Sequence, residues 1–67
     1  MITKENIGTE LQKQMTKYKV RAEYIALKLN MSFGAVIKWK DGDRVPAQPT
    51  IDRLNLIFKR AKAKEAL

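Results

Sequence analysis

Residues 33–41 carry side chains that an exposed helix seldom combines. On a helical wheel with about 100° between residues, one arc is apolar and is expected to face the core; it holds Ala35, Val36 and Trp39. The outward arc, where Glu, Lys and Gln are usual, holds Phe33, Gly34, Ile37, Lys38 and Asp41. Two apolar groups, a bare stretch of backbone and a cation therefore share one exposed surface.

That outward arc has the chemistry needed to contact bases in the major groove of DNA. Phe33 and Ile37 can pack on the methyl group of thymine, and Lys38 can donate to guanine O6 or N7. Gly34 has no side chain, so the backbone of the first helical turn can come close to DNA. We predict that Phe33, Gly34, Ile37 and Lys38 are base-reading residues.

Two other interpretations of the same arc stay open. Phe33 can fold back over Met31 or Tyr24, since exposed phenylalanine is uncommon on monomers. Alternatively, Phe33 and Ile37 can form an apolar patch that binds another protein.

The elements that would position this arc are helices. Apolar spacing indicates four helical segments and no strand; we expect them from Lys4 to Tyr18, from Arg21 to Leu29, from Phe33 to Lys40, and from Pro49 onward. Thr3 is expected to cap the first segment, and the fourth is expected to fray beyond Arg60. The core-facing residues of the other segments are Ile7, Leu11, Met15, Tyr18, Ala22, Ile25, Ala26, Leu29, Ile51, Leu54, Ile57, Phe58 and Ala61.

A short turn separates the second and third segments. Asn30 is the best residue other than glycine for a left-handed helix end, Met31 is a single apolar linker, and Ser32 is a good N-cap. Two helices joined by about three residues have the spacing of a helix-turn-helix. Gly42 is expected to end the third segment. We therefore expect an all-α fold, a compact bundle of four or five short helices that contains a helix-turn-helix.

Composition narrows the class of protein. The 67 residues predict a single domain, 1–67, with a basic tail over 57–67. The sequence contains no cysteine or histidine, so we expect no disulfide, no metal site and no cofactor. No apolar run approaches the roughly 20 residues that span a bilayer, and the first residues lack the apolar region of a signal peptide. We expect a cytoplasmic protein without membrane contact.

The charge of the chain is strongly positive. Fourteen Lys and Arg residues face seven Asp and Glu residues, which gives a net charge of +7. On a domain of this size, such a charge is the electrostatic footprint of a nucleic-acid binder. A basic protein without any polyanionic partner is the alternative.

Over residues 22–46, AEYIALKLNMSFGAVIKWKDGDRVP, the sequence resembles the helix-turn-helix of the Cro/CI (XRE) repressors. The matching features are a second helix ending in a turn, a serine opening the third helix, two buried positions and a glycine loop closed by proline; they are Ile25, Ala26, Leu29, Asn30, Ser32, Val36, Trp39, Gly42 and Pro46. About residues 5–60 can be laid on that domain. The resemblance implies a four- or five-helix bundle whose third helix enters the major groove.

The sequence also departs from the family pattern. Family members often pair a Glu before the glycine loop with an Arg on the first helix, but these positions hold Lys40 and Met15. That ion pair is therefore impossible, and Lys40 is free to meet a phosphate. Phe33 and Gly34 replace the usual polar readers, so the preferred base sequence stays open. The fifth helix of the family, often used for dimerisation, is missing or reduced to the tail.

Four residues are predicted to contact phosphates, and they are Arg21, Ser32, Lys40 and Arg44. The resemblance places Arg21 and Arg44 beside the DNA backbone, and the helix that Arg21 opens favours an anion at its N-terminus. Solvated surface side chains are the alternative for all four. Lys17 and Lys19 are weaker candidates, and the KRAKAK run at 59–64 is interpreted as a basic helix end.

These observations favour a sequence-specific, double-stranded DNA-binding regulator, a phage- or prophage-type Cro-like repressor that occupies an operator. Because one copy makes few base contacts, we expect a homodimer, at least on a two-fold DNA site. Leu56 lies off the core face and is a candidate dimer contact, with a lone exposed leucine as the alternative. No small-molecule ligand is expected.

The residues are compatible with two other functions to different degrees. An antitoxin-type module would use the Phe33–Ile37 arc or Leu56 to sequester a toxin, and a neighbouring toxin gene would favour it. An enzyme is poorly supported, because the sequence has no His or Cys, a single Ser, and carboxylates without paired spacing on a buried face.

Overall fold

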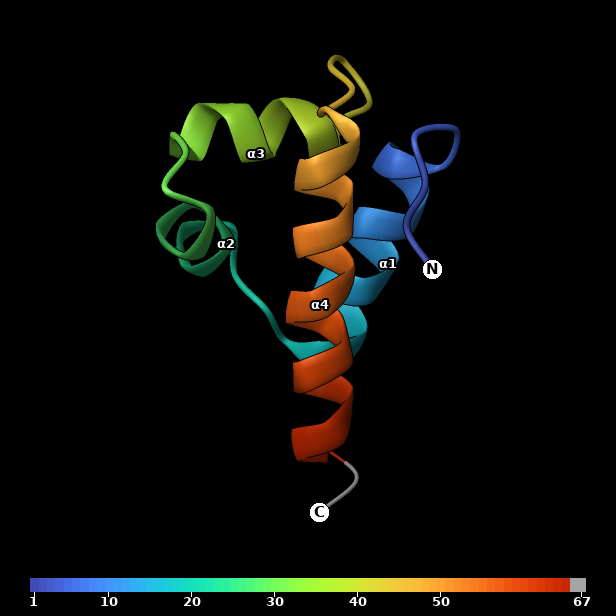
Figure 1. Ribbon diagram of the computed structural model, residues 1–67, viewed down its shortest axis with the longest axis vertical. Helices are drawn as coiled ribbons and strands as arrows, with labels where there is room; N and C mark the ends of the chain where they lie inside the picture. The colour runs from blue at the N-terminus through green and yellow to red at the C-terminus, as the bar shows by residue number, and fades with distance from the viewer. Residues whose placement is uncertain (66–67) are drawn as a thin grey trace.

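Four helices form the fold, and the computed structural model describes residues 1–65. The helices are α1 (Ile7–Tyr18), α2 (Ala22–Leu29), α3 (Phe33–Lys40) and α4 (Gln48–Glu65), and no strand occurs in the described residues. Figure 1 shows α3 across one end of the bundle, with α2 beside it and viewed almost along the axis of α2. In the same view α4 runs down the molecule in front of α1. The predicted all-α bundle is confirmed, and the helix-turn-helix consists of α2 and α3.

The turn between α2 and α3 has the predicted conformation. Asn30 is left-handed, with φ 54° and ψ 43°, and the amide of Met31 donates to the carbonyl of Ala26 at 2.9 Å. This pattern closes a helix that ends in a Schellman motif. Ser32 then caps α3, because its side-chain oxygen accepts from the amide of Ala35 at 3.1 Å.

The other two helix ends before α4 use the same motif. Gly42 follows α3 with φ 79°, and the amide of Asp43 donates to the carbonyl of Lys38 at 2.9 Å. Lys19 follows α1 with φ 56°, and the amide of Val20 donates to Met15 at 3.0 Å. A left-handed lysine is uncommon, and nothing in the sequence predicted it.

The core is apolar, since none of the buried side chains that the structure describes is polar or charged. Its members come from all four helices and from the N-terminal segment; they are Ile2, Ile7, Leu11, Ala22, Ile25, Ala26, Leu29, Val36, Trp39, Ile51, Leu54 and Phe58. The face predicted for α2 is confirmed in full. Several side chains predicted as core are only partly buried, and they are Met15, Tyr18, Ala35, Ile57 and Ala61.

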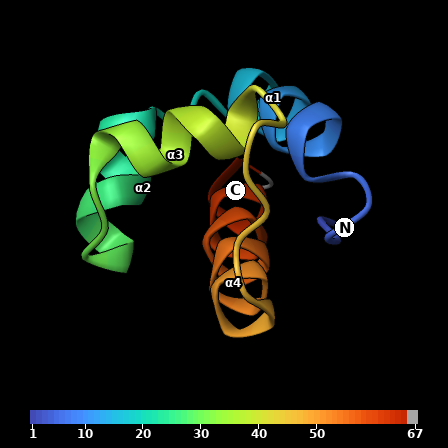
Figure 2. The ribbon, with the colours of Figure 1, turned by 90° about the horizontal axis from the view of Figure 1, so that it is seen from above.

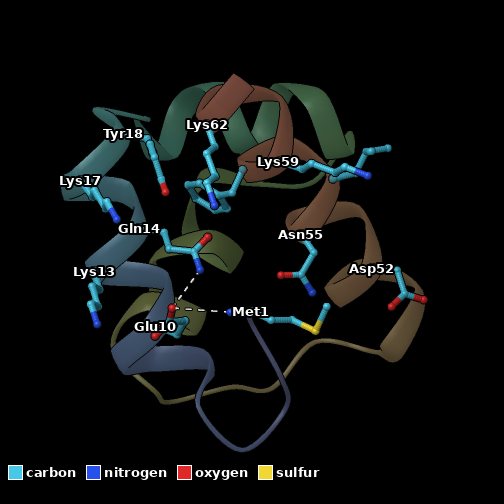
Figure 3. A pocket seen from close by; sticks show the side chains of 12 residues that line it. Met1, Glu10, Lys13, Gln14, Lys17, Tyr18, Asp52, Asn55, Lys59 and Lys62 are labelled. Carbon is cyan, nitrogen blue, oxygen red and sulfur yellow. Dashed lines mark hydrogen bonds and ion pairs between the residues drawn. The ribbon is translucent and has the colours of Figure 1, made fainter. Parts of the chain in front are cut away.

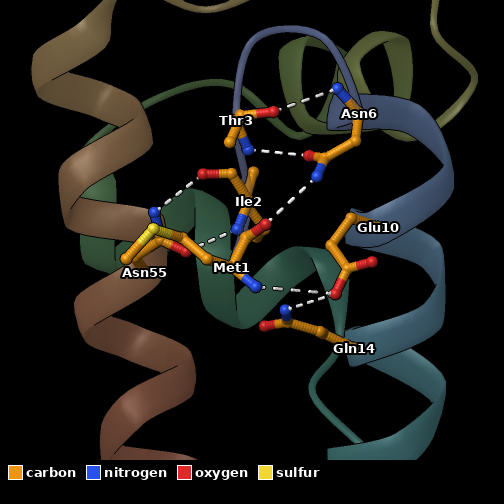
Figure 4. A network of polar contacts seen from close by, with 7 residues as sticks. All are labelled: Met1, Ile2, Thr3, Asn6, Glu10, Gln14 and Asn55. Carbon is orange, nitrogen blue, oxygen red and sulfur yellow. Dashed lines mark hydrogen bonds and ion pairs between the residues drawn. The ribbon is translucent and has the colours of Figure 1, made fainter.

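The first helix begins later than predicted. Residues 4–6 form a turn, and α1 starts at Ile7 rather than Lys4. Thr3 caps this turn instead of the helix itself. Its hydroxyl accepts from the amide of Asn6 at 3.3 Å, while its own amide donates to Oδ1 of Asn6 at 2.7 Å. The exchange is the reciprocal pattern of a capping box, and Figure 4 shows both bonds.

The fourth helix ends later than predicted. The expectation of fraying beyond Arg60 is wrong, because α4 continues to Glu65. Alanine and lysine, which dominate this part, are strong helix formers, and cations in a last turn favour the helix dipole. Residues 66–67 of the predicted basic tail lie outside the described residues. Over residues 1–65, no helix is both long and apolar enough to cross a membrane.

The N-terminal segment is held against α4 by one asparagine. Oδ1 of Asn55 accepts from the amide of Ile2 at 2.8 Å, and its Nδ2 donates to the carbonyl of Ile2 at 2.9 Å. Figure 4 shows these two bonds between the segment and α4. Ile2 is thereby fixed in the core, next to the helices that support α3.

We expect Asn55→Ala to lower the free energy of unfolding by about 1–3 kcal/mol, because two hydrogen bonds to a part-buried backbone are lost. Urea denaturation followed by circular dichroism measures this change. Lys59→Ala, an exposed substitution one turn further along α4, should change the free energy by less than about 0.5 kcal/mol. Equal losses from both variants would mean that the two hydrogen bonds between Asn55 and Ile2 add nothing to stability.

Candidate nucleic-acid interface

The third helix is anchored on one side and open on the other. It packs against α1 and α2, and the side chains of Val36 and Trp39 are buried. Figure 2, seen from above, shows α3 in front of α2, with the loop after α3 passing over the start of α4. The outer surface of α3 therefore lies at one end of the molecule.

Three of the four predicted base-reading residues are exposed on this surface. Phe33 is 48% exposed, and Gly34 and Lys38 are also exposed. Ile37 departs from the prediction of an exposed residue, because its side chain is partly buried and packs against the core. The buried arc of α3 is wider than the wheel indicated, since α1 and α2 both contact this helix.

Phe33 does not fold away from solvent. Tyr24 and Met31, the residues over which it was expected to fold in the alternative interpretation, are also exposed. About half of the phenylalanine surface is therefore available to a partner.

Gly34 is not required by the packing of the fold. A Cβ atom built at Gly34 meets no other atom within 4 Å. The helical Gly8 differs, because its Cβ would lie 3.2 Å from the backbone of Gly42. A glycine inside a helix costs about 1 kcal/mol relative to alanine. At Gly8 the close approach of the Gly42 backbone explains why a glycine is present in spite of this cost. At Gly34 the fold offers no such explanation.

The four residues predicted to contact phosphates differ in how exposed they are. Arg21, Ser32 and Arg44 are exposed. Arg21 is the N-cap residue of α2, with extended backbone and no side-chain capping bond. It therefore lies just outside the helix that it was predicted to begin. Lys40 is partly buried, which makes it less accessible than the sequence suggested.

Two side chains tie the helix-turn-helix to the rest of the bundle. Nε2 of Gln12, on α1, donates to the carbonyl of Lys40 at 2.9 Å. Nη2 of Arg53, on α4, donates to the carbonyl of Lys28 at 3.1 Å. Each bond satisfies a carbonyl in the last turn of a helix, where no intrahelical partner exists. The Gln12 bond connects α1 to α3 without the ion pair that Lys40 and Met15 rule out, and the Arg53 bond connects α4 to α2. Sequence reasoning missed both.

The side chains of Lys38 and Arg44 are not engaged in ion pairs within the described part of the chain. In the described part of the chain, neither Lys38 nor Arg44 has a carboxylate oxygen within 4.0 Å, and the one ion pair joins the Met1 ammonium to Glu10 at 3.9 Å. Asp41 and Asp43 are exposed in the loop that carries Arg44. These carboxylates repel phosphates that come close to them.

Apolar side chains are exposed on α2 and in the turn that follows it. Tyr24 and Leu27 lie on α2, and Met31 lies in the turn. Leu27, which the sequence analysis did not single out, is 79% exposed. Leu56, the predicted dimer contact, is 46% exposed. It lies on α4, in a groove between α4 and α1.

Comparisons of this chain with protein-family models, with curated proteins and with solved structures found no match.

Proposed function

We propose that the protein is a sequence-specific, double-stranded DNA-binding regulator of the Cro/CI type that represses transcription by occupying an operator. The observation that carries this proposal is the outer surface of α3, where Phe33 and Lys38 are exposed beside a glycine that packing does not require. In a helix that binds no ligand, that glycine would lower the stability of the helix without any compensating contact.

The dimensions of α3 suit the major groove. An α-helix with its side chains is about 10–12 Å in diameter, and the major groove of B-DNA is about 12 Å wide. Recognition helices contact bases mainly through their N-terminal residues. Phe33 and Gly34 occupy the first turn of α3, and Lys38 follows one turn later. Arg21 and Arg44 would hold the phosphates on either side.

One such helix reads too few bases for an operator. Two copies on half-sites about 34–36 Å apart would double the contacts. We therefore propose binding as a homodimer on a two-fold site, in the cytoplasm where such a regulator meets DNA.

Lys38 and Arg44 should separate base reading from backbone contact. Lys38→Ala should weaken binding to the preferred site by about 1–3 kcal/mol and affect random DNA much less. Arg44→Ala should weaken both DNAs alike and reduce the log–log salt slope by about one unit. Binding isotherms on both DNAs at several salt concentrations measure these effects. If Lys38→Ala weakens both DNAs equally, Lys38 contacts phosphate instead of a base edge.

Gly34→Ala should raise stability and lower DNA affinity together. Alanine removes a helix penalty of about 0.5–1 kcal/mol, and its methyl group meets no protein atom. On DNA, the same methyl group would hold the first turn of α3 away from the groove. Thermal melts and binding isotherms of one preparation provide both numbers.

Gly42→Ala is the matched control for this glycine. Its Cβ would also meet open space, but φ is +79°, so alanine should cost about 1–2 kcal/mol of stability. If Gly34→Ala is more stable and binds DNA as tightly as the unchanged protein, Gly34 has no role in recognition.

A further inference from the structure

A groove of about 610 Å³ runs between α1 and α4. Three side chains give it an apolar floor, namely Tyr18, Leu56 and Phe58. The rings of Tyr18 and Phe58 lie 6.4 Å apart between centroids, and Leu56 is nearly half exposed. Figure 3 shows Tyr18 and the polar lining from both helices around this space.

Lysines form both sides of this groove. Lys13 and Lys17 lie one turn apart on α1, and Lys59 and Lys62 lie one turn apart on α4. All four are exposed. Within the described part of the chain, no carboxylate oxygen lies within 4.0 Å of Lys13, Lys17 or Lys59. Glu10 and Asp52 are the two carboxylates among the lining residues, so the groove keeps a net positive charge.

The carboxylates of the groove already have partners in the protein. Oε1 of Glu10 accepts from Nε2 of Gln14 at 2.9 Å and faces the Met1 ammonium at 3.9 Å. The bond from Gln14, together with the positive charges of Met1, Lys13 and Lys17, lowers the pKa of Glu10. Asp52 accepts from Gln48 at 3.0 Å.

This groove is separate from the outer surface of α3. No residue of α2, α3 or the loop between α3 and α4 lines it. Figure 1 shows the C-terminal parts of α1 and α4 at the end of the molecule away from α3.

We propose that the groove between α1 and α4 docks an acidic amphipathic helix of a partner protein. The apolar face of that helix would cover Tyr18 and Leu56, and its carboxylates would lie along the two rows of lysines. Apolar anchors inside a charged rim are the usual anatomy of a helix-in-groove site. A helix of about 10–12 Å diameter fits a trough between two helices.

Two other occupants fit less well. A DNA backbone would meet the lysines but gain nothing from the apolar floor, and Glu10 and Asp52 would repel its phosphates. A second copy, in a two-fold contact through Leu56, would place the same lysines against one another. Like charges across an interface are unfavourable.

The test uses a fluorescent peptide of about 15 residues, with leucines on one helical face and glutamates beside them. Its partner peptide carries lysine for every glutamate. Anisotropy titrations of the full chain should show binding of the acidic peptide, with a dissociation constant at least tenfold lower than that of the basic one. Leu56→Ala and Lys59→Glu should each weaken binding about tenfold.

Matched variants outside the groove decide whether the binding is local. Leu27→Ala and Lys28→Glu remove an exposed leucine and reverse an exposed lysine on α2, and each should change the affinity for the peptide less than about twofold. Amide shifts in the NMR spectrum should change along α1 and α4. Equal losses from Lys28→Glu and Lys59→Glu, or shifts gathered on α2 and α3, would overturn the proposal.

The other occupants give different results. Competition by random duplex DNA that is lost in Lys59→Glu would assign the groove to nucleic acid, and a dimer abolished by Leu56→Ala would assign it to a second copy. Either result contradicts docking of an acidic partner. Phe33→Ala, a change on α3 outside the groove, should weaken DNA binding and leave binding of the acidic peptide unchanged, so failure here is distinguishable from failure of the proposed DNA-binding function.

Discussion

Trp39→Ala is expected to leave most of the protein unfolded near room temperature. The indole is 2% exposed and belongs to the core beneath α3. Truncating a buried tryptophan costs about 3–5 kcal/mol. At about 0.05–0.15 kcal/mol per residue, a chain of 67 residues has a total stability of only about 3–10 kcal/mol. The loss therefore takes about a third or more of the available stability, and nearly all of it at the lower end of that range.

A circular dichroism melt measures this effect, with Tyr24→Ala as the control. Tyr24 is also aromatic and helical, but it is 48% exposed, so its loss should change stability by about 0.5 kcal/mol or less. The Trp39 variant should melt at least about 10 °C below the unchanged protein. Equal melting temperatures for the two variants would mean that Trp39 does not hold α3 on the bundle.

Local signals in the sequence were sufficient to predict the helix-turn-helix. Asn30 and Ser32 specify a left-handed end and an N-cap through their own side chains and backbone, without help from distant residues. The bounds of α3 follow from the cap at Ser32 and the stop at Gly42, and the structure confirms them. The apolar stripe of α2 is regular, so its buried face was equally clear.

Features that depend on contacts between distant segments could not be predicted. Ile2 is buried because Asn55, 53 residues away in the sequence, binds both polar groups of its backbone. Ile37 is partly buried because α1 and α2 both contact α3, and a wheel of one helix does not contain its neighbours. The groove between α1 and α4 likewise brings together lysines from two helices whose sequences show no common pattern.

Binding to a preferred DNA site is expected to be at least about 10³-fold tighter than binding to random duplex at physiological salt. Phosphate contacts alone would bind every sequence alike, because they carry no base information. Direct contacts of Phe33 and Lys38 with base edges would supply the difference when two copies bind together, since a good bidentate contact with a base edge is worth about 1–3 kcal/mol.

The most direct test of DNA reading by α3 is a mobility-shift titration on a site selected from random duplexes. The selected sequences should share a two-fold-related motif, and unlabelled random duplex should compete at least about 10³-fold less well than the unlabelled site. Selection without a common motif, or equal competition by random duplex, would contradict sequence-specific recognition and leave only attraction between a +7 protein and a polyanion.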